Sequence, residues 1–265
     1  MISWFSNISV IYQALLASLF TWGVTILGAS IVFFFKEIRK GIMDALLGFS
    51  AGVMIAASFW SLLSPAISMA ENLKMNVCLT VFIGFFSGGL LLFIGDKIYS
   101  VFSKKKSISN NKIKRSIMLI FSITLHNIPE GMVVGVAFGS LVYGINGATL
   151  ASAITLAIGI GLQNFPEGSA VSLPLRREGF SRGKSFFYGQ LSGIVEPISA
   201  VLGAILVLKI QTLLPFLLSF AAGAMIYVVV EELIPESQTN KRKDLMALFT
   251  LIGFSVMMIL DVALG

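Results

Sequence analysis

Eight stretches of mostly apolar residues account for most of this 265-residue chain. A helix of about 20 residues spans the roughly 30 Å hydrocarbon core of a bilayer, and each stretch reaches or exceeds that length. The chain is 56% hydrophobic and only 12% charged, which excludes a water-soluble core within a polar shell. We therefore predict an all-α integral membrane protein, with residues 1–265 forming a single transmembrane domain of eight helices. The predicted helices are 10–35, 44–69, 77–99, 116–140, 148–174, 186–208, 213–234 and 245–264.

The basic residues lie almost entirely in alternate connections between the predicted helices. Of the 19 Lys and Arg residues, 17 follow the first, third, fifth or seventh helix, and only Lys74 and Lys209 lie on the other side. Positive charge marks the cytoplasmic side, so an even number of helices places both termini outside the cytoplasm. The basic cytoplasmic loop at about 100–115 is either a solvated linker or a contact for anionic lipid headgroups. This placement explains the net charge of +6 without a nucleic-acid partner.

The sequence also contains an internal repeat. GFSAGVMIAAS at 48–58 resembles SFAAGAMIYVV at 219–229, and LGASIV at 27–32 parallels LGAILV at 202–207. Helices 1–3 therefore recur as helices 6–8, and the odd offset makes the two copies enter the membrane from opposite faces. Inverted repeats around a polar site, here on the central helices 4 and 5, are typical of secondary transporters. The alternative is a chance likeness between apolar helices rich in small residues.

Two polar motifs interrupt the fourth and fifth apolar stretches, HNIPEG at 126–131 and QNFPEG at 163–168. On a helix, residue i+4 lies only about 40° from residue i, whereas residue i+1 lies about 100° away. Each glutamate, Glu130 or Glu167, therefore falls between the first two side chains of its motif. The proline of each motif also leaves a carbonyl oxygen one turn earlier without its helical donor. This arrangement suits a carboxylate that two adjacent cations share.

Glu196, in VEPIS on the predicted sixth helix, adds a third carboxylate at a similar depth. An ionised carboxylate in hydrocarbon costs roughly 3 kcal/mol or more, and no intramembrane Lys or Arg is available to pair with the three acids. They need protons or a metal. A set of His, Glu, Gln, Asn and Met donors suits Zn²⁺, Fe²⁺, Mn²⁺ or Cd²⁺ better than Ca²⁺ or Mg²⁺. The alternative is that these polar side chains only join helices.

These motifs resemble those of the ZIP (Zrt/Irt-like) metal transporters, and within that family the GufA-like branch. AGVMIAASFWSLLSP, HNIPEG, QNFPEG, VEP and ELIPES occur in the family's order along the whole chain. The resemblance implies an eight-helix protein of the cell (inner) membrane that carries divalent cations into the cytoplasm. It implies neither enzymatic activity nor a cofactor. It further implies a homodimer in the lipid bilayer, and an elevator-like movement of helices 1, 4, 5 and 6 against helices 2, 3, 7 and 8.

The resemblance also implies a two-metal centre between the fourth and fifth helices. One metal would be held by His126, Glu130, Gln163 and Glu167, with Met54 approaching from the second helix. Its neighbour would be held by Asn127, Glu130, Asn164, Glu167 and Glu196. Glu232 and Asp261 match acidic positions similar to those along the family's metal path, and Glu231 stands where related sequences often have His.

Gln163 departs from the many family members that have His at the start of this motif, so a neutral carbonyl oxygen replaces an imidazole. We expect zinc to be carried together with iron, manganese or cadmium. Among other classes, a metalloprotease of the H-E-x-x-H type is excluded, because the chain has one histidine. A Ser/His hydrolase has only Ser122, one turn before His126, in its favour. A proton-coupled exporter or a metal-gated channel would use the same ligands and stays open.

Overall fold

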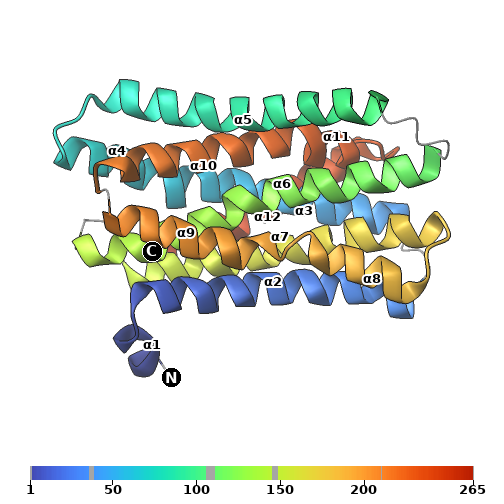
Figure 1. Ribbon diagram of the computed structural model, residues 1–265, viewed down its shortest axis with the longest axis horizontal. Helices are drawn as coiled ribbons and strands as arrows, with labels where there is room; N and C mark the ends of the chain where they lie inside the picture. The colour runs from blue at the N-terminus through green and yellow to red at the C-terminus, as the bar shows by residue number, and fades with distance from the viewer. Residues whose placement is uncertain (1, 36–38, 106–110, 145–148, 210, 265) are drawn as a thin grey trace.

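The computed structural model describes residues 2–35, 39–105, 111–144, 149–209 and 211–264, and this part of the chain is helical without strands (Figure 1). Some side chains within these ranges, including that of His126, lie outside the description. The elements are α1 Ile2–Asn7, α2 Val10–Phe34, α3 Lys40–Ala57, η1 Ser58–Leu63, α4 Ser64–Asn72, α5 Val77–Lys105, α6 Asn111–Ser140, η2 Leu141–Tyr143, α7 Leu150–Arg177, α8 Arg182–Leu191, α9 Val195–Lys209, η3 Gln211–Leu213, α10 Leu214–Val228, η4 Val229–Leu233, α11 Ile234–Ser237 and α12 Lys243–Leu264.

Six helices within the described residues are long and apolar enough to cross a membrane. They correspond to the first, second, third, sixth, seventh and eighth predicted helices, with bounds of Val10–Phe34, Lys40–Asn72, Val77–Gly95, Arg182–Lys209, Leu214–Ser237 and Lys243–Ala263. The other two predictions correspond to α6 and α7, which are 30 and 28 residues long. These two helices carry the HNIPEG and QNFPEG motifs. An integral membrane protein is therefore confirmed.

The predicted basic loop at about 100–115 is shorter than expected, because the helices before and after it both extend into this range. α5 continues to Lys105 and α6 begins at Asn111. A helix can continue through Lys and other polar residues, so the loss of apolar character in the sequence does not mark the end of the helix.

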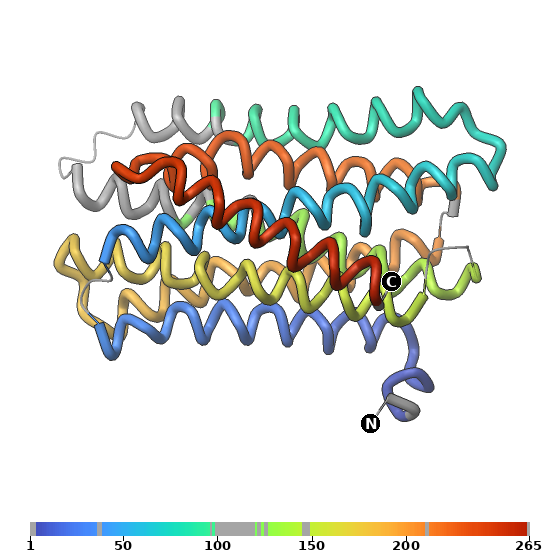
Figure 2. Tube along the Cα trace, turned by 180° about the vertical axis from the view of Figure 1, so that it is seen from behind, coloured from blue at the N-terminus to red at the C-terminus, as the bar shows by residue number. Residues whose placement is uncertain are grey.

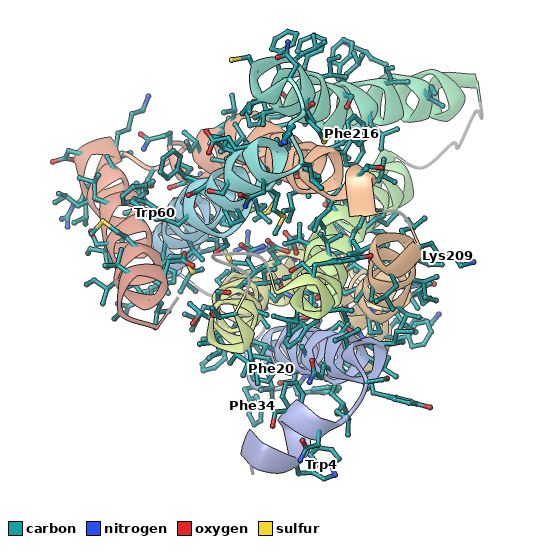
Figure 3. All side chains as sticks on the ribbon, turned by 90° about the vertical axis from the view of Figure 1, so that its left-hand side faces the viewer. Trp4, Phe20, Phe34, Trp60, Lys209 and Phe216 are labelled. Atoms are coloured by element: carbon teal, nitrogen blue, oxygen red, sulfur yellow. The ribbon has the colours of Figure 1, made fainter. Side chains whose placement is uncertain are left out.

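The long helices alternate in direction along the bundle (Figures 1 and 2). One end of the bundle gathers the last residues of α2, α5, α7 and α11 and the first residues of α3, α6, α8 and α12, which are the basic connections. Lys209 lies at the opposite end, which faces the viewer in Figure 3. Both ends of the chain lie toward that opposite end.

Two of the membrane-length helices widen into π turns at corresponding positions of the sequence repeat. These turns are η1 and η4, which occupy Ser58–Leu63 and Val229–Leu233. Each is followed by a short helix whose second residue is a proline, Pro65 or Pro235. Proline cannot donate to the carbonyl four residues earlier and its ring crowds that carbonyl, so the helix widens just before it.

The sixth predicted helix is divided into α8 and α9 by a break at residues 192–194. Pro197 has no N–H to donate to the carbonyl of Gly193, and the N–H of Glu196 bonds to that carbonyl at 3.0 Å instead. The break places Glu196 in the first turn of α9, where its side chain is fully buried.

The helices pack as two sets, seen along the bundle in Figure 3. In one set, α2 packs mainly on α7, and α6 packs mainly on α9. In the other set, α10 packs on α5, and α12 lies on the outside of the bundle against α3. Glycine allows the close approach of the second set, since a Cβ on Gly52 would overlap the carbonyl oxygen of Thr250, and a Cβ on Gly223 would overlap that of Phe85.

Candidate metal centre

The two predicted motifs meet at the contact between α6 and α7. Gln163 Nε2 donates a hydrogen bond of 2.6 Å to Oε1 of Glu130, and both side chains are buried. The first residue of one motif thus contacts the glutamate of the other. This pairing is one that the predicted first metal position requires, because both side chains would have to reach the same cation.

Glu196 is held by donors from two helices. Asn164 Nδ2 lies 3.0 Å from Oε1 and 2.9 Å from Oε2 of Glu196, which joins α7 to α9. Thr21 of α2 donates to Oε2 at 2.5 Å, and Thr25 donates to Oε1 at 3.5 Å. The sequence prediction missed both threonines, because a hydroxyl on an apolar helix carries no local signal of a partner 175 residues away.

Asn127 reaches the break before α9. Its Nδ2 donates a 2.9 Å hydrogen bond to the carbonyl oxygen of Ser192, which is one of the residues between α8 and α9. A non-helical backbone is tolerated at membrane depth where it is buried in protein and its polar groups find partners. The break therefore contributes a backbone acceptor next to the predicted second metal position.

Four acceptor oxygens of the predicted ligands are buried without a hydrogen-bond partner. They are Asn127 Oδ1, Glu130 Oε2, Gln163 Oε1 and Asn164 Oδ1. Buried side-chain oxygens are normally bonded, so each such atom requires an explanation. A divalent cation is bonded by such oxygens and needs no donor proton, so the donor set fits a metal ion.

Glu167 belongs to the same group of charges. It is buried on α7, within electrostatic reach of Glu130, Glu196 and Glu232. Glu130 is also within reach of Glu196. The three carboxylates predicted from the sequence therefore gather in one region, and Glu232, at the π turn η4, lies beside it.

Met54 and His126 are the two remaining predicted ligands of the first position. Met54 is fully buried on α3, one turn after Ser50, whose hydroxyl donates to the carbonyl of Gln163 at 3.4 Å. This contact brings the Met54 face of α3 against the start of the α7 motif. His126 lies one turn before Glu130 on α6, and its side chain falls outside the described residues.

Asp261 and Glu231 are the other two weaker candidates. Asp261 is buried on α12 and accepts a 2.7 Å hydrogen bond from Ser61 of η1. Its Oδ2 has no partner. Glu231 is exposed on η4. Within the described side chains, no three His, Cys, Asp or Glu residues converge on one point as a metal site by themselves, so amide oxygens must complete any metal site among these residues.

A membrane-embedded helical bundle that buries three carboxylates and several amide oxygens between its helices defines a class of protein that handles cations within the bilayer. The family model described as ZIP Zinc transporter matches residues 108–261. The chain is 38% identical to the zinc transporter ZIP11 of Homo sapiens, over 97% of this chain and 98% of that protein. It is 31% identical to the zinc transporter GufA of Myxococcus xanthus, over 95% of this chain and 98% of that protein. The chain belongs to the ZIP family of metal transporters.

Proposed function

We propose that this protein carries divalent transition-metal cations, Zn²⁺ and also Fe²⁺, Mn²⁺ or Cd²⁺, through a two-metal centre between α6 and α7. The observation that carries the proposal is the set of four buried acceptor oxygens without partners. All four belong to residues of the HNIPEG and QNFPEG motifs. Polar side chains that only joined helices would use these oxygens as acceptors for neighbouring donors.

The two positions share their glutamates. The first cation binds Glu130, Glu167 and Gln163, with His126 and Met54, and the second binds Glu130, Glu167 and Glu196, with Asn127 and Asn164. The hydrogen bond from Gln163 to Glu130 and those from Asn164 to Glu196 support this division, because each joins two proposed ligands of one position. Every ligand comes from one chain, so a second copy in the proposed homodimer is not needed to complete the centre.

The packing supports an elevator-like movement of α2, α6, α7, α8 and α9 against the remaining helices. Each described glycine that closely approaches the backbone of another helix does so within its own set, as Gly28 does with Phe165 and Gly253 with Phe49. Across the two sets, Gly159 of α7 meets the flexible side chain of Met257 on α12. The backbone contacts within each set would hold it together as a unit. The side-chain contacts between the two sets can change, so the sets can slide past each other.

The close contacts also support an inverted repeat. Gly52 and Gly223 occupy equivalent places in the repeated sequences, and they approach Thr250 and Phe85 respectively. In such a repeat, α3 corresponds to α10 and α12 corresponds to α5. The packing of α3 on α12 is then equivalent to the packing of α10 on α5. We propose that α6 and α7 cross the membrane as the central pair, which gives eight crossings with the basic connections in the cytoplasm and both termini outside.

Flux measurements test the proposal. Proteoliposomes with the purified chain in a known orientation should take up radioactive zinc, and the E130A variant should not. A matched control is E71Q, which removes a carboxylate that is exposed on α4. A pH gradient across the vesicle membrane distinguishes the exporter from the channel. Zinc flux that is driven by protons moving the opposite way favours proton-coupled export. Zinc flux that does not saturate as the zinc concentration rises favours a channel. Absence of metal flux under all these conditions contradicts the proposal.

A further inference from the structure

A hollow of about 930 Å³ is lined by residues from the first part of α3 and of α12. Both helices begin at the basic end of the bundle (Figure 2). The walls of the hollow are helix faces, because the apolar residues recur at intervals of three or four along each helix. Several of these side chains are exposed, Ile42 by 52% and Ile252 by 50%. The apolar wall residues that recur in this way are Ile42, Leu46 and Phe49 of α3 and Leu245, Phe249 and Ile252 of α12.

The same hollow is also lined by four cations. Arg39 and Lys40 come from the start of α3, and Lys241 and Arg242 come from the connection before α12. All four are exposed. No carboxylate is present among the described residues that line the hollow, so the positive charge at its mouth is not neutralised from within.

Hydrogen bonds fix the connection that carries two of these cations. Asn240 Nδ2 donates to Oδ2 of Asp44 at 2.8 Å, and the N–H of Arg242 donates to Oδ1 of Asn240 at 2.9 Å. Asp44 is 1% exposed. Because Asp44 is buried on α3 and accepts this bond, it anchors the connection to that helix, and it is not among the residues that line the hollow.

We propose that this hollow is a binding site for an anionic phospholipid, with the phosphate at the four cations and an acyl chain between the walls of α3 and α12. The rise from Lys40 to Phe49 is about 14 Å at 1.5 Å per residue. Half of the hydrocarbon core is about 15 Å thick, so the walls match the depth of one leaflet. Charge at the mouth and apolar walls below it together fit an amphiphile, whereas a free phosphate would use only the mouth.

None of the described residues that line this site is a proposed metal ligand, and the site does not depend on the proposed transport. Its occupant would touch both α3 and α12, on the outer side of the set that contains them. A lipid bound there would be a specific ligand of the protein, in contrast to the bulk lipids that surround any membrane protein.

Retention of lipid by the purified full chain tests this inference. Native mass spectrometry with equimolar phosphatidylglycerol and phosphatidylcholine should show preferential retention of phosphatidylglycerol. The variant R39Q/K40Q/K241Q/R242Q should retain at least about tenfold less of it, because each Lys or Arg near an anionic headgroup contributes to binding. The matched control K97Q/R177Q/R182Q/K184Q removes four other exposed cations from the same end of the bundle and should retain it as the wild type does.

A second variant separates a lipid from a simple anion. A45L adds apolar volume inside the hollow, which Ala45 lines, without changing the charge, and it should also weaken retention. Equal losses in the two four-cation variants would mean diffuse surface charge and would overturn the site. Unchanged retention in A45L, or displacement of the lipid by millimolar inorganic phosphate, would overturn the acyl-chain contact. Thermal unfolding in phosphatidylcholine, equal for all variants, shows that each is folded.

Discussion

The amide of Gln163 donates a 2.6 Å hydrogen bond to the carboxylate of Glu130 across the contact between α6 and α7. The bond uses one oxygen of Glu130 and leaves the other, together with the oxygen of Gln163, buried without a partner. The two helices are therefore joined by their own candidate ligands. In the proposed first position, a cation would bind the two unpartnered oxygens, Glu130 Oε2 and Gln163 Oε1.

The first prediction concerns metal preference. Q163H should tighten the binding of zinc relative to manganese, because imidazole favours the later metal more than an amide oxygen does. Competition binding with both metals on purified protein measures the ratio. Q238H, which changes an amide outside the centre, should leave the ratio unchanged. If Q163H also leaves it unchanged, Gln163 does not contact the ion.

The second prediction concerns stoichiometry. E130A or E167A should abolish both metal positions, since each carboxylate is a proposed bridge. E196A or N127A should abolish only the second position. Metal content of the folded variants measures this, and E71Q, which removes an exposed carboxylate, should keep both metals. Two bound cations in E167A would show that Glu167 does not bridge.

The third prediction concerns Thr21, whose hydroxyl donates to the buried Glu196. T21V should lower the free energy of unfolding of the metal-free protein by about 1–3 kcal/mol, because a buried acceptor loses its donor. A cation bound to Glu196 would compensate, so the loss should shrink with zinc present. Thermal unfolding with and without zinc measures the difference, and T239V on the exposed connection is the control. A loss of equal size in both conditions would assign Thr21 a structural role alone.

The fourth prediction concerns pH. Metal binding requires deprotonated carboxylates and a neutral imidazole, so binding should release protons and the affinity should rise as the pH rises. Calorimetry in buffers of different ionisation enthalpy counts the protons that are released between about pH 5 and 7. E196Q should release fewer. No release in the wild-type protein would argue against a carboxylate-lined site.

The fifth prediction concerns orientation. In a C78S background, a cysteine at Asn7 should react with an impermeant thiol reagent added to intact cells, whereas a cysteine at Thr239 should be protected. Both positions are exposed. Asn7 ends α1 and Thr239 follows α11, and these two helices lie toward opposite ends of the bundle (Figure 1). Permeabilised cells, in which both should react, provide the control. The reverse pattern would place the basic connections outside the cytoplasm.

The sequence predicted the positions of the long helices because apolar length is a local property. The cost of Glu130, Glu167 and Glu196 in hydrocarbon indicated only that they need protons or a metal, and the resemblance to the ZIP family implied that they share one centre. The sequence did not predict the break before Glu196, although Pro197 was a local signal of lost helical bonding. The role of Thr21 depends on a contact between α2 and α9, and no residue near Thr21 in the sequence reports it. Long-range partners of this kind follow from packing alone.

The π turns at Ser58–Leu63 and Val229–Leu233 each contain one residue more than a regular helix would need over the same rise. A single-residue deletion inside either turn would return that segment to α-helical geometry and leave the faces on both sides in register. The same deletion elsewhere in these helices would rotate everything beyond it by about 100° and turn buried side chains toward lipid. The described residues thus include two places where a helix can be shortened by one residue without being reoriented. One turn contains Ser61, which donates to Asp261, and the other contains Glu232, so both involve acids of the proposed metal path.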